Sequence, residues 1–161
     1  LEEELEAVDN YIYILNVRFA GDIHFSKKVE CDVENVRVPS MILQPVVENA
    51  VNHGIRNIDW EGHIDLSVEK WNDHIEISVR DNGLGMTGEQ IQRVLSKKVH
   101  SSSGVGDSTG IGMNNVISRL ELYYERDGLM EIYSEGEGMG TEVVINIPLE
   151  RSEKNVQNPD C

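Results

Sequence analysis

The chain has 161 residues, of which 39% are hydrophobic, and its 14 basic and 29 acidic residues give a formal charge of −15 at pH 7. This length and composition predict one folded domain with a core of ordinary size and exclude a disordered chain. The negative charge argues against nucleic acid and anionic membranes as partners, because both carry phosphate. The two cysteines, Cys31 and Cys161, are far apart, which favours a reducing compartment over a disulfide framework.

The start of the sequence predicts a helix over residues 2–19. Leu5, Val8 and Ile12 recur there at three- and four-residue steps. We expect this helix either to pack on its own domain or to form one arm of a helical bundle whose partner is missing. The chain begins at Leu1, with neither a signal peptide nor an apolar run of the ~20 residues that span a bilayer. We therefore expect a fragment of a longer protein.

The rest of the chain alternates between strand and helix patterns. Strands are predicted over residues 24–32, 64–71, 75–81, 129–134 and 141–148, and helices over 40–55, 88–96 and 111–124. Ser40 is the expected N-cap of the helix at 40–55, and Gly54 its expected end. Residues 97–110 lack periodicity and predict a mobile loop, and the last eleven residues predict a frayed tail. This order of elements predicts an α+β two-layer sandwich.

The predicted helix at 40–55 carries a polar strip within an otherwise apolar sequence. Glu48 and Asn52 are four residues apart, as are Asn49 and His53, so the four share one face. A solvated helix face is the ordinary interpretation, but such faces are rich in Lys and Glu, whereas this one carries amide and imidazole groups. An amide oxygen is a ligand of the kind that Mg²⁺ takes beside waters and substrate phosphates. Asn49 is therefore a candidate metal ligand.

The predicted strand at 75–81 ends in the sequence DNGLGM, residues 81–86. A carboxylate at a strand end, followed by Gly83 and Gly85, allows the backbone to approach a ligand closely while the carboxylate points at it. An ordinary Asp-Asn-Gly turn is the alternative. Residues 83–88 also match G-x-G-x-x-G, but a dinucleotide fingerprint needs a helix and then a parallel strand ending in an acidic residue about 20 positions on. The polar loop lies there instead, which argues against that fold.

The sequence STGIGM at 108–113 directly precedes a predicted helix. Glycines at a helix N-terminus leave free backbone N–H groups at the positive end of the helix dipole, which suits phosphate, although a flexible hinge would have the same composition. A basic cluster lies just upstream in this acidic chain, at Arg93, Lys97, Lys98 and His100. The sequence contains no P-loop, no zinc-ligand spacing and no G-x-S-x-G nucleophile motif.

These three segments, in this order, resemble the conserved boxes of the GHKL ATPases, a superfamily that includes gyrase, a class of heat-shock chaperones and the histidine kinases. QPVVENAVNHG at 44–54 resembles the N box, DNGLGM the G1 box and STGIGM the G2 box, and Gly140-Thr141 resembles the last conserved element. The resemblance implies a Bergerat-type ATP-binding fold, with a mixed, mostly antiparallel sheet covered on one face by helices. It covers about residues 1–149.

Within this superfamily the chain looks like the LytS/YesM-type sensor histidine kinases, through VPSMILQPVVENAVNHGI, GIGMNNVISRL and the N-terminal segment. The resemblance implies that residues 1–20 end the dimerisation and phosphoacceptor region, that 21–150 form the catalytic domain and that 151–161 form a disordered tail. Two features depart from the wider kinase pattern. The sequence has no Phe-containing box between G1 and G2, and no P-H-F-L-x-N-like acceptor motif surrounds any of its five histidines.

The resemblance also implies roles for individual residues. Asn49 would ligand Mg²⁺ on the ATP phosphates, Asp81 would accept the adenine amino hydrogen with support from Thr141 through water, and Glu48 would polarise the incoming histidine. The catalytic residues are thus Glu48 and Asn49, and the lid spans about 87–112. The residues expected to bind ATP are Asn49, Asn52, His53, Asp81, Gly83, Gly85, Met86, Lys97, Lys98, Thr109, Gly110, Ile111, Gly112, Met113 and Thr141.

The sequence therefore predicts the Mg-ATP-binding domain of a histidine kinase. Its expected partners are its own upstream phosphoacceptor helix and a response regulator, within a membrane-anchored homodimer whose catalytic domain lies in the cytoplasm of a bacterium. One alternative is another GHKL ATPase or an anti-sigma-type kinase. Pro45 argues against a simple hydrolase, which would be expected to carry an acid there to activate water. The other alternative is a degenerate module that binds a nucleotide or a protein without catalysis.

Overall fold

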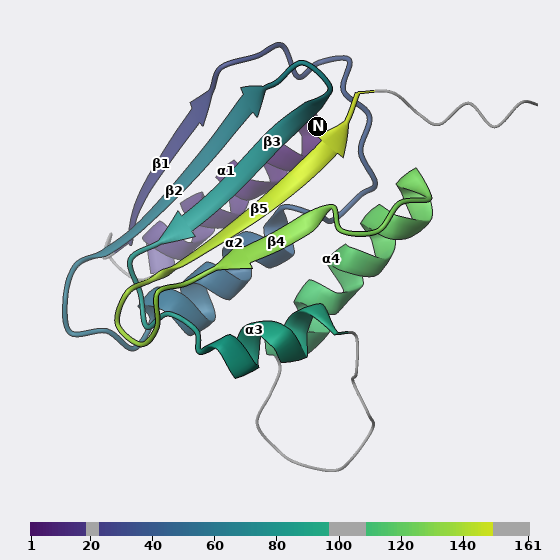
Figure 1. Cartoon of the computed structure of the whole chain (residues 1–161). Helices are drawn as coiled ribbons and strands as arrows, with labels where there is room; N and C mark the ends of the chain where they lie inside the picture. The colour runs from purple at the N-terminus through teal and green to yellow at the C-terminus, as the bar shows by residue number, and fades with distance from the viewer. Residues whose placement is uncertain (19–22, 97–108, 150–161) are drawn as a thin grey trace, which may run out of the picture.

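The computed structural model of the chain describes residues 1–18, 23–96 and 109–149. Four α-helices, one π-helical segment and five strands are formed by the described residues (Figure 1). In chain order they are α1 (Glu2–Arg18), β1 (Ile23–Val29), α2 (Gln44–Asn49), the π-helix η1 (Ala50–Ile55), β2 (Gly62–Lys70), β3 (His74–Asp81), α3 (Gly88–Leu95), α4 (Thr109–Tyr124), β4 (Met130–Tyr133) and β5 (Thr141–Pro148).

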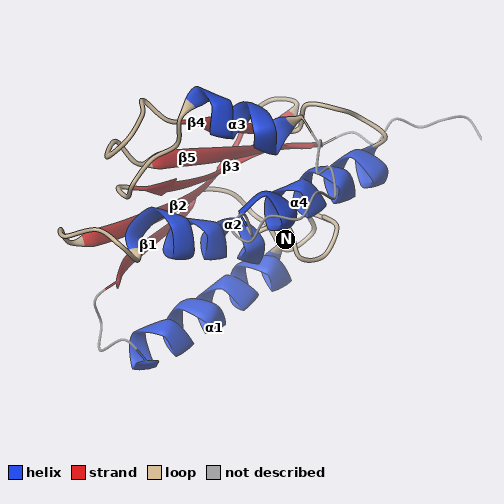
Figure 2. Cartoon of the chain, turned by 90° about the horizontal axis from the view of Figure 1, so that it is seen from below, coloured by secondary structure: helices blue, strands red, loops and turns tan. Residues whose placement is uncertain are grey.

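The five strands form one sheet in the order β1-β2-β3-β5-β4. Only the β1–β2 pair is parallel, and the other three pairs are antiparallel. Figure 2 shows α1, α2 and α4 on one side of the sheet, while α3 contacts α4 and the edge strand β4. The prediction of a mixed, mostly antiparallel sheet covered on one face by helices is confirmed.

The core lies between the sheet and its covering helices. Alternate residues of the strands face it, because successive side chains of a strand point to opposite faces. The central strands contribute Ile64, Leu66, Val68, Ile75, Ile77, Val79, Val143, Ile145 and Ile147, all of them buried. Helix α1 packs Leu5, Val8 and Ile12 into the same core. Among the described helices, none is long and apolar enough to cross a membrane.

The helix predicted over residues 40–55 differs from the observed structure in two ways. It begins at Gln44, after an N-cap residue Leu43 that makes no side-chain cap, so the assignment of Ser40 as N-cap is wrong. From Ala50 the helix widens into a π-helix that ends at Ile55. The start is displaced because a carboxylate from α1 already binds the backbone amides of residues 41–43.

The other predicted boundaries are close to those observed. Strand 141–148 is confirmed at both ends, β1 ends three residues earlier than predicted and α4 begins two residues earlier. The expected mobile loop lies outside the described residues except for its last two positions, which begin α4. Lys97, Lys98 and the tail at 151–161 also lie outside the described residues. The division of the chain into residues 1–20, 21–150 and 151–161 stays a prediction.

Candidate nucleotide-binding site

Asp81 is the last residue of β3 and is only 6% exposed. Its side-chain Oδ1 accepts a hydrogen bond of 2.8 Å from the backbone N–H of Gly83. Burial raises the pKa of this carboxyl group to about 6, although hydrogen bonds from the backbone of Gly83 and Thr141 oppose that rise. A carboxyl group at a strand end, held by backbone amides in an apolar surrounding, is able to orient an acceptor oxygen toward a ligand.

The π-helix η1 closes directly against this carboxylate. A Cβ on Gly54 would lie 2.6 Å from Asp81 Oδ1, so only a glycine fits at this position. The Gly54 carbonyl accepts a hydrogen bond of 2.9 Å from the Leu84 amide, and a Cβ on Gly83 would lie 2.1 Å from the Gly54 carbonyl carbon. The segments that resemble the N box and the G1 box are therefore packed backbone to backbone around Asp81.

The turn between β4 and β5 supports the loop at 81–86 from its other side. The Gly140 amide donates to the carbonyl of Gly83, and the Ser134 hydroxyl accepts from the Met86 amide at 2.9 Å. Gly85 has a φ of +72°, and a Cβ there would lie 2.1 Å from the Gly136 carbonyl oxygen. Among the described residues, Gly83 and Gly85 thus allow a close approach to other backbone segments of the protein, at Gly54 and Gly136.

Asn49 ends helix α2, just before η1 begins. Its side-chain Oδ1 is buried and accepts no hydrogen bond from the described residues. A buried acceptor without a partner is uncommon in native proteins and calls for an explanation such as an ion that completes it. Its neighbour Glu48 is half-buried, and Glu48 Oε1 accepts a hydrogen bond of 2.8 Å from the side-chain amide of Gln44.

The polar strip predicted on this helix is divided by burial. Asn52 and His53 are exposed, whereas Glu48 and Asn49 are partly buried. Asn52 Oδ1 accepts from the guanidinium of Arg56 at 3.4 Å. The change from α-helix to π-helix after Asn49 alters the spacing on which the strip was predicted, since a π-helix bonds residues five apart.

The remaining predicted residues are distributed between the core and the first turn of α4. Met113 is 2% exposed and belongs to the core, so its side chain packs on apolar residues, and Met86 packs partly against the same core. Thr109, Gly110 and Ile111 begin α4. A Cβ on Gly112 would meet no described atom within 4 Å, so packing does not require a glycine there.

Sequence reasoning missed several residues that shape the site. Gly54 was expected only to end a helix, Ser134 had no assigned role, and Asn82 was one letter of a turn motif. In the structure the Asn82 side chain donates to the Glu61 carbonyl and accepts from the His63 amide, while the Trp60 indole donates to the Asn82 carbonyl. The need for a glycine at position 54 depends on a carboxylate 27 residues away, and no local pattern pointed to Ser134.

The donor set around Asn49 fits a hard cation bound by few protein oxygens. In the described part of the chain, no group of three or more His, Cys, Asp or Glu side chains is arranged to hold a metal ion. Mg²⁺ commonly takes only one or two protein ligands and completes its shell with waters and phosphates. Asn49 Oδ1, which has no hydrogen-bond partner among the described residues, is compatible with that mode of binding.

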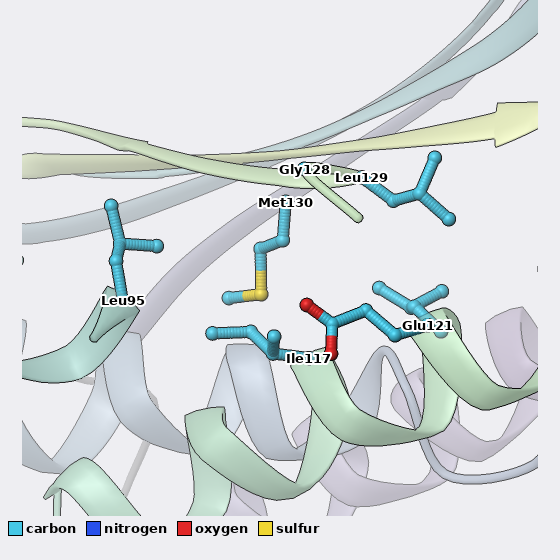
Figure 3. Close-up of a pocket in the computed structure, with 7 residues that line it drawn as sticks. Leu95, Ile117, Glu121, Gly128, Leu129 and Met130 are labelled. Carbon is cyan, nitrogen blue, oxygen red and sulfur yellow. The ribbon is translucent and has the colours of Figure 1, made fainter. Parts of the chain in front are cut away.

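A separate cavity of about 200 Å³ lies between α3, α4 and β4. It is lined mainly by apolar side chains, and Figure 3 shows Met130 extending from β4 toward Ile117 and Glu121 on α4. None of the residues predicted to bind ATP lines this cavity. The candidate site is therefore the region around Asp81, Gly54 and Asn49.

One family of ATPases matches most of the chain. Residues 37–151 match the family described as histidine kinase-, DNA gyrase B-, and HSP90-like ATPase. The chain belongs to this family. The matched residues include the segments that resemble the N, G1 and G2 boxes, and every strand of the sheet except β1.

Sensor kinases of this ATPase family are similar over nearly the whole chain. The sensor protein LytS of Staphylococcus saprophyticus is 28% identical over 162 residues, which cover 100% of this chain and 26% of that protein. The sensor histidine kinase/phosphatase LytS of Staphylococcus aureus is 31% identical, with 96% and 26% covered, and Escherichia coli YpdA is 30% identical, with 94% and 25% covered. The chain spans about a quarter of the length of these relatives.

Solved structures of histidine kinase catalytic domains share the fold. The nucleotide-free catalytic domain of histidine kinase ThkA superposes with a TM-score of 0.58 at 20% identity, covering 90% of this chain and 92% of that one. The mycobacterial sensor histidine kinase MprB gives a TM-score of 0.58 at 19% identity, covering 89% and 93%. The expected Bergerat-type architecture is confirmed at the level of the fold.

Proposed function

We propose that this ATPase-family domain binds Mg-ATP and transfers the γ-phosphoryl group to a histidine of the longer sensor kinase from which it comes. One observation carries the proposal. The N-box helix and the loop after β3 meet at Gly54, around the buried carboxylate of Asp81. That arrangement places one oriented acceptor beside a helix that also carries the amide oxygen of Asn49, which has no partner in the part of the chain that the structure describes.

Asp81 is the group that would select adenine. Its carboxylate accepts a hydrogen bond from the exocyclic amine of adenine. Guanine carries a carbonyl oxygen at that position, and this oxygen would repel the carboxylate. An unsatisfied buried polar group costs about 1–3 kcal/mol. The amides of Gly83 and Thr141 hold the carboxylate, so its acceptor direction is set before the nucleotide arrives.

Asn49 would hold Mg²⁺ through Oδ1, and the cation would neutralise charge on the phosphates. Phosphoryl transfer depends mainly on positioning and charge neutralisation, which one amide ligand and the backbone N–H groups of a helix N-terminus can provide. The first turn of α4, with Gly110 and Gly112, is the helix N-terminus proposed for the phosphates. His53, Lys97 and Lys98 are the further phosphate contacts proposed from the sequence.

Glu48 would act on the acceptor histidine. The imidazole nitrogen attacks the γ-phosphorus, the bond to the bridging oxygen breaks, ADP leaves, and the imidazole proton passes to the Glu48 carboxylate. General-base assistance of this kind contributes about 10²–10⁴-fold to the rate. The hydrogen bond from Gln44 orients Glu48 Oε1 and leaves Oε2 as the proton acceptor.

The partners follow from the sensor kinases that the chain resembles. We propose an upstream phosphoacceptor helix in the same protein, a response regulator that receives the phosphoryl group, and a membrane-anchored homodimer as the intact protein. The similarity to the sensor protein LytS and to the sensor histidine kinase YpdA supports a sensor kinase. Pro45 in the first turn of α2 disfavours a simple hydrolase, because it offers no carboxylate to activate water.

Calorimetric titration with ATP and GTP, in Mg²⁺ and in EDTA, tests the binding step. We expect ATP to bind in Mg²⁺, to bind less tightly in EDTA, and to bind more tightly than GTP. Adding a separately made upstream helix from the intact protein tests transfer: labelled phosphate should move to that helix, and Glu48→Gln should slow the transfer more than it weakens ATP binding. Equal affinities for ATP and GTP would refute the role of Asp81.

A further inference from the structure

The start of helix α2 is capped by a side chain that is distant in sequence. Glu4, in the first turn of α1, accepts hydrogen bonds from three consecutive backbone amides. Its Oε1 lies 2.6 Å from the amide of Met41, and its Oε2 lies 2.8 Å and 3.0 Å from those of Ile42 and Leu43. These amides belong to the N-cap residue Leu43 and to the two residues before it, so the carboxylate fixes the chain at the entry to α2, a helix whose N-cap residue makes no side-chain cap of its own.

The backbone at this cap adopts a conformation that the local sequence does not favour. Met41 has a φ of +58°, which is rare for a residue with a side chain. Such a conformation persists only where surrounding contacts enforce it. The contacts seen here include the three hydrogen bonds to Glu4, the complete burial of Ile42 and Leu43, and a hydrogen bond of 2.8 Å from the guanidinium of Arg119 in α4 to the carbonyl of Ser40. The entry to the N-box helix is therefore held by α1, through Glu4, together with α4, through Arg119.

Leu43 links this cap to the residues of the proposed active site. Its N–H donates to Glu4, and its carbonyl accepts the first helical hydrogen bonds, from Val46 at 3.1 Å and from Val47 at 3.0 Å. The next residue, Gln44, holds Glu48 by a hydrogen bond of 2.8 Å. A continuous series of bonds thus joins the Glu4 carboxylate to the helix that presents Glu48 and Asn49.

Tyr11 of α1 lies close enough to Glu48 of α2 to be affected by its charge. The negative charge of Glu48 acts on Tyr11, and together with burial, the larger cause, it raises the pKa of the Tyr11 hydroxyl. Tyr11 packs against the core beside Leu5, Val8 and Ile12 of α1. Glu4 thus binds the residues that lead into α2, and Tyr11 lies within reach of the charge of Glu48 toward the other end of that helix.

We propose that Glu4 is a positioning residue for the nucleotide site: by capping α2 from α1, it sets where Glu48 and Asn49 lie. The proposal rests on the function proposed above for these two residues. It makes α1 part of the catalytic unit, so that a displacement of α1 along its axis moves the N-box helix. Such a displacement would change how the site holds phosphate and the cation, and it would leave the part of the site around Asp81 unchanged.

Glu4→Gln tests this proposal, because it keeps the shape of the side chain and removes the charge that the three amides bind. Glu3→Gln is the matched control, since Glu3 is exposed, neighbours Glu4 and loses the same charge. We expect Glu4→Gln to weaken Mg-ATP binding about 5-fold or more, to leave adenosine binding within about 2-fold, and to speed amide hydrogen exchange at residues 41–43. We expect Glu3→Gln to match the wild type in all three.

Glu4→Asp separates positioning from a loss of fold. The shorter acid keeps the charge but reaches fewer amides, so its Mg-ATP affinity should fall between those of wild type and Glu4→Gln while its melting temperature stays near the wild-type value. Equal Mg-ATP affinity for Glu4→Gln and Glu3→Gln would overturn the proposal, as would an equal loss for Mg-ATP and adenosine. If the wild type itself fails to bind Mg-ATP, the proposed function fails, and unchanged exchange at residues 41–43 in Glu4→Gln would then refute the cap separately.

Discussion

Gly54 lies so close to the carboxylate of Asp81 that a single added carbon would sit 2.6 Å from Oδ1. The two residues come from different motifs, 27 positions apart, and their contact brings the N-box helix onto the end of β3. The carbonyl of Gly54 also accepts a hydrogen bond from the Leu84 amide, so the N-box helix and the loop after β3 are joined by a hydrogen bond as well as by close packing. The geometry of the proposed adenine site thus depends on the absence of a side chain at position 54.

Gly54→Ala should therefore damage both stability and binding. The added methyl group has no room, and overpacking of this kind costs about 1–3 kcal/mol. Urea denaturation should show that loss, and calorimetry should show that ATP affinity falls as Asp81 is pushed aside. Gly88→Ala is the control, because a Cβ there meets nothing within 4 Å. Full ATP affinity in Gly54→Ala would show that Asp81 is not the adenine acceptor.

Gly112→Ala should have the opposite effect on stability. A Cβ at this position meets no described atom within 4 Å, and alanine in a helix is about 0.5–1 kcal/mol more favourable than glycine. The variant should be more stable in urea than the wild type. Its Mg-ATP affinity should nevertheless fall, by about tenfold, if the open space is where phosphates approach the backbone of α4. A variant that gains stability and keeps its affinity would remove Gly112 from the site.

Asn49→Ala should remove the dependence of ATP binding on Mg²⁺. The Asn49 oxygen makes no hydrogen bond with the described residues, so its loss should leave the free energy of unfolding unchanged or raise it by up to about 1 kcal/mol. Affinity for Mg-ATP should fall on the order of 10-fold to 100-fold, toward the value measured in EDTA. Asn72→Ala, in the exposed turn between β2 and β3, is the control. A retained Mg²⁺ dependence would place the cation elsewhere.

Asp81 should make the protein less stable as the pH rises from 4 to 7. Its pKa is raised from 3.8 to about 6 in the folded state, so the folded protein holds the proton more tightly than the unfolded chain. The stabilisation is complete below pH 3.8 and is lost as the pH passes through 6, with a maximum of about 3 kcal/mol. Denaturation of wild type and Asp81→Asn at several pH values isolates this effect, because only the wild type loses it. Parallel curves for the two proteins would contradict the raised pKa.

The sequence by itself determined the elements whose signals are local. Strand 141–148 was predicted at its exact bounds, because alternating apolar residues between a glycine-rich turn and a proline leave one register that buries them. The three motifs were identifiable because each carries its glycines, Asp or Asn within a few residues. Asp81 and Asn49 were proposed as site residues in this way.

Tertiary structure decided what depends on residues far apart in the chain. The cap of α2 comes from Glu4, 37 to 39 positions before the amides that it binds, so no local pattern could replace the mistaken N-cap at Ser40. Met113 belongs to a motif and yet lies in the core, because the helix that carries it turns that side chain toward the sheet. Only glycine fits at positions 54 and 83, because a Cβ on Gly54 would meet the carboxylate of Asp81 and a Cβ on Gly83 would meet the backbone of Gly54. Close approach between distant segments is a property of the folded chain, and only the fold shows which glycines it requires.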